Sequence, residues 1–196
     1  MTFRLGLTGS IGMGKTTTAA MFAEAGVPIW DADAAVARLY APGGAAIAPM
    51  SRAFPEAIVA GAVSKEALKS IISARPEALK EIEAIVHPLV AADRQAFVDS
   101  TGAPIALFDI PLLYETGADA WLDAVAVVTT SEANQRARVL SRGTMTEAQL
   151  DLILARQMPD AEKRRRADFI IPTDTLETAR AAVDDILRQI GERLDA

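Results

Sequence analysis

The residues with the most specific chemistry lie near the N-terminus, where Gly9, Gly12, Gly14, Lys15 and Thr16 form the pattern G-x-x-x-x-G-K-[ST]. Glycines allow a tight loop and let backbone N–H groups approach an anion without a Cβ in the way. These N–H groups and those of a following helix form a nest for phosphate. Within it, the Lys15 ammonium can reach the β- and γ-phosphates of a nucleotide, and the Thr16 hydroxyl can bind Mg²⁺. We therefore expect an ATP site lined by Gly12, Met13, Gly14, Lys15, Thr16 and Thr17.

Carboxylates follow two of the strands that the sequence predicts. Asp31 and Asp33 come directly after the apolar run Val27–Trp30, and Asp109 ends another such run. In open α/β folds, ligands bind at the carboxyl edge of the sheet, where these side chains would lie. Asp33 there could orient or deprotonate an acceptor hydroxyl, and Asp109 or Asp31 could bind Mg²⁺ through water. The alternatives are that one of the first two caps the helix Ala34–Tyr40 and that Asp109 is solvated at its strand end.

A parallel sheet is needed to bring these residues together. Short apolar runs predict strands at Arg4–Thr8, Val27–Trp30, Pro104–Asp109, Ala124–Thr129 and Asp168–Pro172. Helical segments separate most of them, and such alternation indicates a three-layer α/β fold with helices on both faces of a five-stranded sheet. The first strand, the glycine loop and a helix over Thr16–Ala25 stand in the order that the phosphate motif requires. A last helix, about Leu176 to Leu194, has apolar residues at helical spacing and closes the fold.

The segment between the second and third strands is too long for one crossover helix. From Asp33 to Ser100 it contains several helical patterns, interrupted by glycine and proline, including the pair His87-Pro88. We expect a helical insertion over the carboxyl edge of the sheet, where a second ligand would bind. The expected organisation is a core of residues 1–32, 101–135 and 167–196, the insertion 33–100 and a lid 136–166.

Composition agrees with a compact enzyme. The chain has 196 residues, enough for one domain with a substantial core, and no cysteine for a disulfide or a thiolate metal site. We expect a cytoplasmic protein with no membrane segment, because no leader or long apolar run is present.

The formal charge of −6 argues against binding to nucleic acid. The lid segment is nevertheless net positive and suits ATP and a phosphorylated acceptor. Nothing in the sequence requires an oligomer.

Several ordered blocks resemble the dephospho-CoA kinase family. They are Gly6–Lys15, Asp31-Ala32-Asp33, His87-Pro88, Pro111–Glu115, and Gln157-Met158-Pro159 with Lys163 and Ala167-Asp168. The resemblance implies a phosphate-loop NTPase fold with a core, a helical acceptor-binding region and a lid. It implies that the γ-phosphoryl group of ATP goes to the ribose 3′-hydroxyl of dephospho-CoA, the last step of coenzyme A biosynthesis. It also assigns Asp33 to the acceptor hydroxyl.

The lid departs from the family at one position. Members often have Arg-Asp-Gly where this chain has Arg142-Gly143-Thr144, so the acidic residue is absent. Thr144 or Thr146 would then cap the next helix. We expect Arg142, at a helix end, to move onto phosphates when the lid closes, and a solvated arginine favoured by the helix dipole is the alternative. Arg138 lies one turn earlier and is the second candidate.

Three further residues are candidates for binding the acceptor. His87 is the sole histidine. It could bond a ligand phosphate or ribose, or it could hold a buried hydrogen bond between helices. Tyr114 could stack on a ligand base, and Glu115 could fix a basic side chain or a ligand hydroxyl.

Two other classes of function remain open from the sequence. One is a phosphate-loop kinase for nucleoside monophosphates or a sugar, and the other is a nucleotide-dependent switch or ATPase. The absence of an N-K-x-D motif disfavours a GTPase, and the long insertion disfavours a switch.

Overall fold

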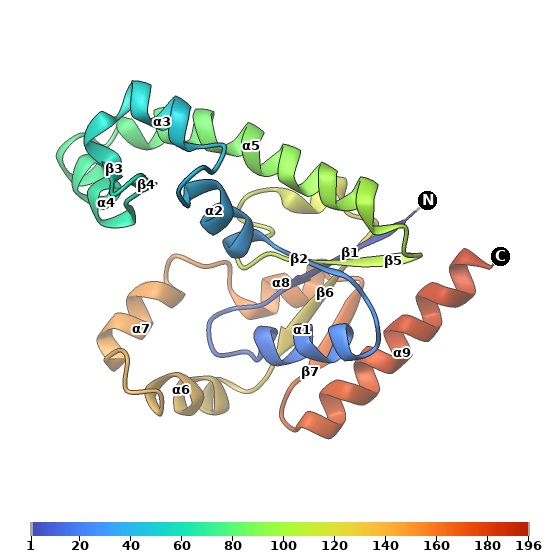
Figure 1. Cartoon of the computed structure of the whole chain (residues 1–196). Coiled ribbons are helices and arrows are strands. Elements are labelled where there is room, and N and C mark those ends of the chain that lie inside the picture. The colour runs from blue at the N-terminus through green and yellow to red at the C-terminus, as the bar shows by residue number, and fades with distance from the viewer. Residues whose placement is uncertain (1, 196) are drawn as a thin grey trace. The chain divides into compact units, whose positions relative to one another are not determined.

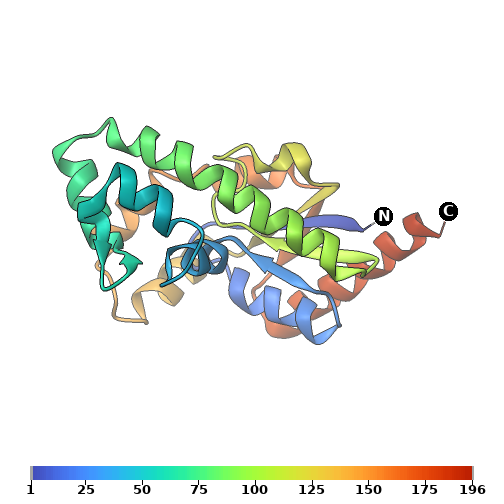
Figure 2. The same cartoon turned by 45° about the horizontal axis from the view of Figure 1, so that its top comes forward.

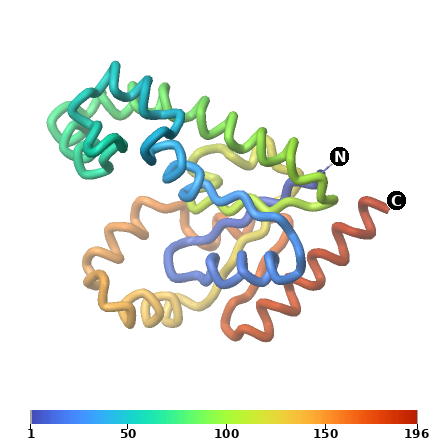
Figure 3. The backbone as a smooth tube through the Cα atoms, in the orientation of Figure 1, coloured from blue at the N-terminus to red at the C-terminus, as the bar shows by residue number. Residues whose placement is uncertain are grey.

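The computed structural model describes residues 2–195 and divides the chain into two compact units. The core unit comprises the residues before Asp31 and after Ser100, and the helical unit comprises Asp31–Ser100. The chain leaves the core unit once and returns once, as the trace in Figure 3 makes clear.

The core unit is built on a parallel sheet of five strands in the order β2-β5-β1-β6-β7. The strands are β1 (Phe3–Thr8), β2 (Ile29–Asp31), β5 (Ile105–Asp109), β6 (Ala124–Thr129) and β7 (Phe169–Pro172). In the central register, Leu5 of β1 stands opposite Leu107 of β5 and Ala124 of β6. Every predicted strand is present, and the predicted α/β fold is confirmed.

Helices cover both faces of this sheet (Figure 1). The helices of the core unit are α1 (Lys15–Glu24), η2 (Ala118–Trp121), α6 (Glu132–Leu140), α7 (Glu147–Leu154), α8 (Asp160–Arg166) and α9 (Leu176–Leu194), and of these α7 lies off the sheet, in the predicted lid. On one face, α1 and α9 pack side by side over the alternating buried residues of the strands, including Leu5 and Leu7. On the other face, Phe108 packs edge-on against Trp121 with ring centroids 5.0 Å apart. Because successive side chains of a strand point to opposite faces, each strand contributes apolar residues to the packing on both faces of the sheet.

The helical unit has its own hydrophobic core. Its elements are α2 (Ala32–Tyr40), α3 (Ile47–Ala53), η1 (Pro55–Ala57), β3 (Ile58–Val59), β4 (Ala62–Val63), α4 (Lys65–Ala74) and α5 (Ala78–Thr101). The buried residues include Met50, Phe54 and Leu68. The antiparallel pair β3–β4 was not predicted, because two residues per strand are too few for a recognisable alternation. The pair turns at Ala60 and Gly61, which both have positive φ.

One expectation about the helical unit was wrong. Pro88 does not interrupt a helix but lies inside α5, which is continuous over 24 residues (Figure 2). A proline in this position removes one backbone donor and leaves the carbonyl of Ala84 without its helical partner. Both Ala84 and Pro88 are exposed, so water can satisfy that carbonyl. Even this long helix is not apolar enough to cross a membrane, and neither is any other within residues 2–195.

Candidate active site

The phosphate loop connects β1 to α1 and has the conformation that its glycines allow. Gly12 has φ 79° and Gly14 has φ 92°, values that other residues rarely adopt. Gly9 is needed for a different reason, because a Cβ there would lie 2.3 Å from Cγ2 of Val128. Gly14 occupies the N-cap of α1 and provides no side-chain cap. The first N–H groups of α1 therefore remain available to an anion.

Lys15 and Asp109 form an ion pair at the carboxyl edge of the sheet. The Lys15 ammonium hydrogen-bonds Oδ1 of Asp109, and the two side chains are 19% and 7% exposed. Asp109 is therefore a buried, paired carboxylate, and the alternative of a solvated strand end is wrong. The adjacent Thr16 is exposed. A hydroxyl and a carboxylate are the hard oxygen donors that Mg²⁺ prefers, so these residues fit that ion.

A pocket of about 330 Å³ lies beside the phosphate loop. It brings together Arg138 and Arg142, which the sequence singled out, with Thr17 of α1. Arg142 is exposed just after α6. Arg138 is fixed, because its guanidinium donates to Oγ1 of Thr173 at 3.1 Å and to the Thr173 carbonyl. The full lining is Gly12, Gly14, Thr17, Thr18, Arg138, Ser141, Arg142, Thr173, Thr175, Leu176 and Ala179.

The loop after β7 contributes residues that the sequence reasoning missed. Thr173 is 7% exposed, and its hydroxyl donates to the carbonyl of Met13 at 2.7 Å. Its side chain also packs against Gly14, where an added Cβ would lie 3.1 Å from Thr173 Oγ1. The position of Thr173 directly after the last strand was the available signal, since ligands bind where parallel strands end.

The predicted lid is held together by a capping box and ion pairs. Thr146 caps α7, accepting from the N–H of Gln149 at 3.3 Å while the Gln149 side chain accepts from the Thr146 N–H at 2.8 Å. Of the two expected caps, Thr146 is correct and Thr144 is not. Arg136 joins α6 to α7 through contacts of 2.7 Å with Asp151 and 3.6 Å with Glu147.

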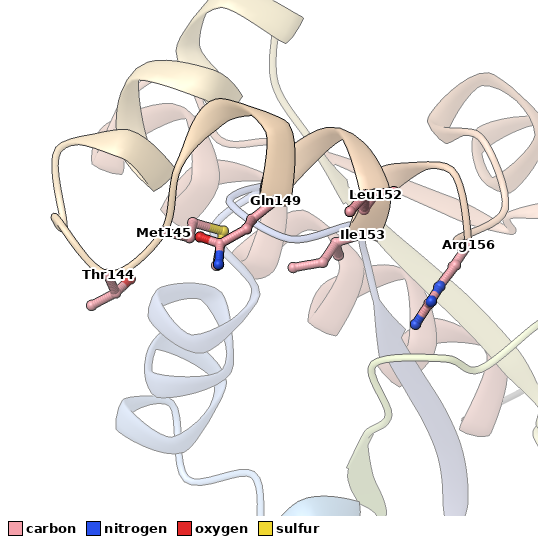
Figure 4. Close-up of a pocket in the computed structure, with 6 residues that line it drawn as sticks. All are labelled: Thr144, Met145, Gln149, Leu152, Ile153 and Arg156. Carbon is pink, nitrogen blue, oxygen red and sulfur yellow. The ribbon is translucent and has the colours of Figure 1, made fainter. Parts of the chain in front are cut away.

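A second pocket, of about 370 Å³, lies on the predicted lid (Figure 4). It is lined by Thr144, Met145, Gln149, Leu152, Ile153 and Arg156. Leu150 on the same helix is fully buried, whereas Leu152 is 64% exposed. The helix therefore presents apolar side chains in two directions, with Leu150 in the fold and Leu152 toward solvent at this pocket.

Glu115 and Tyr114 both contact basic side chains of the core unit. The Glu115 carboxylate accepts from the N–H of Met158 at 2.8 Å and pairs with the fully buried ammonium of Lys163 at 3.0 Å. Burial raises the pKa of Glu115, but the hydrogen bonds from Met158 and Lys163 outweigh this effect and the net pKa is lowered. Of the two roles considered for Glu115, fixing a basic side chain is therefore the one present.

The expectation that Tyr114 stacks on a ligand base does not agree with the structure. Its side chain is buried, and the Arg166 guanidinium lies 4.9 Å from the centroid of its ring. Burial, together with Asp168 and Asp119, raises the pKa of Tyr114 to about 12. A buried ring covered by a guanidinium cannot stack on a base in this conformation.

Three candidate residues belong to the helical unit. Asp31 is the N-cap of α2 and accepts from the N–H of Ala34 at 2.9 Å, so the capping alternative holds for Asp31. Asp33 lies in the first turn of α2 and is exposed. His87 is exposed on α5, which excludes the buried hydrogen bond considered for it.

A phosphate loop between the first strand and helix of this sheet, beside a pocket with two arginines, defines a nucleotide-binding protein of the phosphate-loop class. The model of the dephospho-CoA kinase family matches residues 3–178, and the chain belongs to this family. The family catalyses the final step of coenzyme A biosynthesis. The predicted family and class of activity are confirmed.

Proteins of similar sequence or structure match this chain over nearly its whole length. A dephospho-CoA kinase of Ruegeria pomeroyi is 64% identical over 190 residues, covering 97% of this chain and 96% of the relative. A crystal structure from Thermus thermophilus is 31% identical with a TM-score of 0.84, covering 96% of this chain and 97% of its own. A dephospho-CoA kinase structure from Campylobacter jejuni shares the fold with a TM-score of 0.70, at 22% identity and 98% coverage of both chains.

Proposed function

We propose that this chain transfers the γ-phosphoryl group of ATP to the ribose 3′-hydroxyl of dephospho-CoA, giving coenzyme A and ADP. The observation that carries the proposal is the phosphate loop ending in Lys15, beside the pocket that contains Arg138 and Arg142. Phosphoryl transfer needs little covalent chemistry from a protein, because positioning and charge neutralisation lower most of the barrier. This site supplies both.

ATP binds with its phosphates in the loop. The N–H groups from Gly12 to Thr16 receive the phosphates, and Thr17 bonds the α-phosphate. Lys15 leaves Asp109 for the β- and γ-phosphates, exchanging one anionic partner for another. Arg142 is exposed and unconstrained by secondary structure, which suits a side chain that moves onto the transferred group in the transition state. Arg138 is anchored to Thr173 and lines the pocket as a fixed positive charge.

Mg²⁺ accompanies ATP, and Thr16 and Asp109 are the residues that would hold it. When bound, the ion neutralises charge on the β- and γ-phosphates. Within residues 2–195, no group of three or more histidine, cysteine, aspartate or glutamate side chains is arranged to hold a metal ion. Phosphate oxygens and water must then complete the coordination, as is usual for Mg²⁺. Asp31 does not belong to this set, because its carboxylate caps α2.

The acceptor hydroxyl is oriented or deprotonated by Asp33. This carboxylate is exposed and makes no capping bond, so it is available to a ligand. His87, also exposed, donates to a phosphate or ribose oxygen of the acceptor. The pocket on the lid suits the pantetheine arm, which alternates apolar groups with amides: Met145, Leu152 and Ile153 supply apolar contacts and Arg156 a charge for the pyrophosphate.

The direct test is an assay of the purified protein with ATP, Mg²⁺ and dephospho-CoA, with the 3′-phosphorylated product identified by mass spectrometry. AMP, adenosine and gluconate serve as comparison acceptors. We expect efficient turnover of dephospho-CoA alone, because binding energy from the pantetheine arm helps to position the reacting hydroxyl. Equal turnover of AMP would overturn the choice of acceptor.

A further inference from the structure

Ile11, at the apex of the phosphate loop, is held from both sides by glutamines outside the loop. The Gln135 side chain donates from Nε2 to the carbonyl of Ile11 at 2.7 Å. The N–H of Ile11 donates to Oε1 of Gln157 at 3.2 Å. Gln135 lies on α6, one residue before the predicted lid, and Gln157 lies inside the lid, just after α7. Both backbone polar groups of one loop residue are thus bonded to side chains at or within the lid.

Each glutamine is itself fixed in place. Gln135 is 4% exposed and packs on Gly12, where an added Cβ would lie 3.3 Å from Gln135 Cγ. Gln157 precedes Met158, whose N–H donates to Glu115, and Glu115 pairs with the fully buried Lys163. Both hydrogen bonds to Ile11 are partly buried, and a hydrogen bond with reduced access to water sets a geometry more firmly than an exposed one.

Neither glutamine lines the pocket beside the phosphate loop. Any effect on a nucleotide must therefore pass through the loop itself, from both glutamines through Ile11 and from Gln135 also through its packing on Gly12. Fixing Ile11 sets the direction of the chain that follows it, and with it the N–H groups of Gly12 to Lys15 that face the phosphates. A loop already held in its binding conformation loses less entropy when the ligand arrives.

We propose that Gln135 and Gln157 are positioning residues that hold the phosphate loop in its ATP-binding conformation and couple it to the lid. The inference rests on the proposed function only in taking ATP as the ligand of the loop. It predicts an effect on ATP affinity that does not require any acceptor to be turned over.

Gln135 donates its hydrogen bond to Ile11 whereas Gln157 accepts one, and this difference can be tested with paired substitutions. Gln157 accepts a hydrogen bond, so Gln157→Glu keeps the acceptor whereas Gln157→Leu removes it. Gln135 donates, so neither Gln135→Glu nor Gln135→Leu can replace it. We expect Gln157→Leu to weaken ATP binding roughly 5- to 10-fold, the size of one lost hydrogen bond, and Gln157→Glu to stay within about twofold of the wild type. Gln189→Leu, on α9, is the matched control and should leave the affinity unchanged.

The measurements are the ATP dissociation constant by calorimetry, the melting temperature, and the kcat and KM for dephospho-CoA. Because Gln135 is buried, its variants are interpreted only if they melt as a single folded species, and the Gln157 pair carries the test. Weaker ATP binding in Gln157→Leu with an unchanged KM for dephospho-CoA would support positioning. A lowered melting temperature with unchanged ATP affinity would overturn it. A wild type that binds ATP but does not phosphorylate dephospho-CoA would count against the proposed function and leave this inference standing.

Discussion

Because Lys15 and Asp109 form an ion pair, we expect the substitution Asp109→Asn to lower the stability of the ligand-free protein and to strengthen its binding of ATP without Mg²⁺. In Asp109→Asn the ammonium of Lys15 loses its anionic partner, whose side chain is 7% exposed. A charge-assisted hydrogen bond in such surroundings contributes about 1.5–3 kcal/mol. Since about 1 kcal/mol shifts the melting temperature of a domain of this size by about 2–4 °C, the ligand-free variant should melt roughly 3–12 °C lower.

The same substitution should strengthen the binding of ATP in the absence of Mg²⁺. In the wild type, phosphates must draw Lys15 away from Asp109 and then lie near the negative charge of its carboxylate. The asparagine removes both costs, and a gain of up to about 1.4 kcal/mol would tighten the dissociation constant up to about tenfold. With Mg²⁺ present the sign reverses for catalysis, because the variant lacks a carboxylate to support the ion, and kcat should fall at least about tenfold.

Calorimetry with ATP and EDTA, thermal melting, and the coupled assay with Mg²⁺ measure the three effects. Asp184→Asn is the matched control, because it removes one exposed carboxylate from α9 and should alter none of them. ATP binding without Mg²⁺ that is unchanged or weaker in Asp109→Asn would refute the reasoning, since Lys15 would then not be shared between carboxylate and phosphate.

Three further predictions address the other assigned residues. Asp33→Asn should lower kcat by roughly 10² to 10⁴ with ATP affinity unchanged by calorimetry, and a large loss of ATP affinity would instead indicate a structural carboxylate. Arg142→Ala should lower kcat without altering the melting temperature, whereas Arg138→Ala should lower both, because only Arg138 holds Thr173. Leu152→Ser should raise the KM for dephospho-CoA about tenfold, as expected for about 1.5 kcal/mol of lost apolar contact. It should leave an analogue without the pantetheine arm unaffected, and an equal effect on both acceptors would contradict the assignment of the lid pocket.

Local signals in the sequence were enough to predict the core. Apolar runs located all five strands of the sheet, and the glycine pattern located the phosphate loop, because both depend on neighbouring residues in the chain. The spacing of apolar residues likewise predicted the bounds of α9, where Val183, Ile186 and Ile190 are buried as expected.

The features that were missed depend on contacts between distant residues. Whether Pro88 breaks a helix is decided by the surroundings of the carbonyl it leaves unbonded, and these are not visible in the sequence. Tyr114 is removed from ligand contact by Arg166, and Thr173 meets Met13 across 160 positions of the chain. Gln135 belongs to no motif, and the family block that contains Gln157 gives this residue no role, so only the folded chain shows that the two glutamines converge on Ile11.

Because the N-terminus of α1 has no side-chain cap, the stability of the native state depends on the concentration of ATP. This helix has Gly14 at its N-cap, no side-chain cap and no acidic residue in its first turn, so its positive end has no counter-charge within the helix. Bound phosphates supply that charge, and a ligand that binds only the native state stabilises it by RT ln(1 + [L]/Kd). At ATP concentrations about 100 times Kd, this amounts to about 2.7 kcal/mol. Starvation for ATP would then slow the reaction and also expose more of the protein to unfolding and proteolysis.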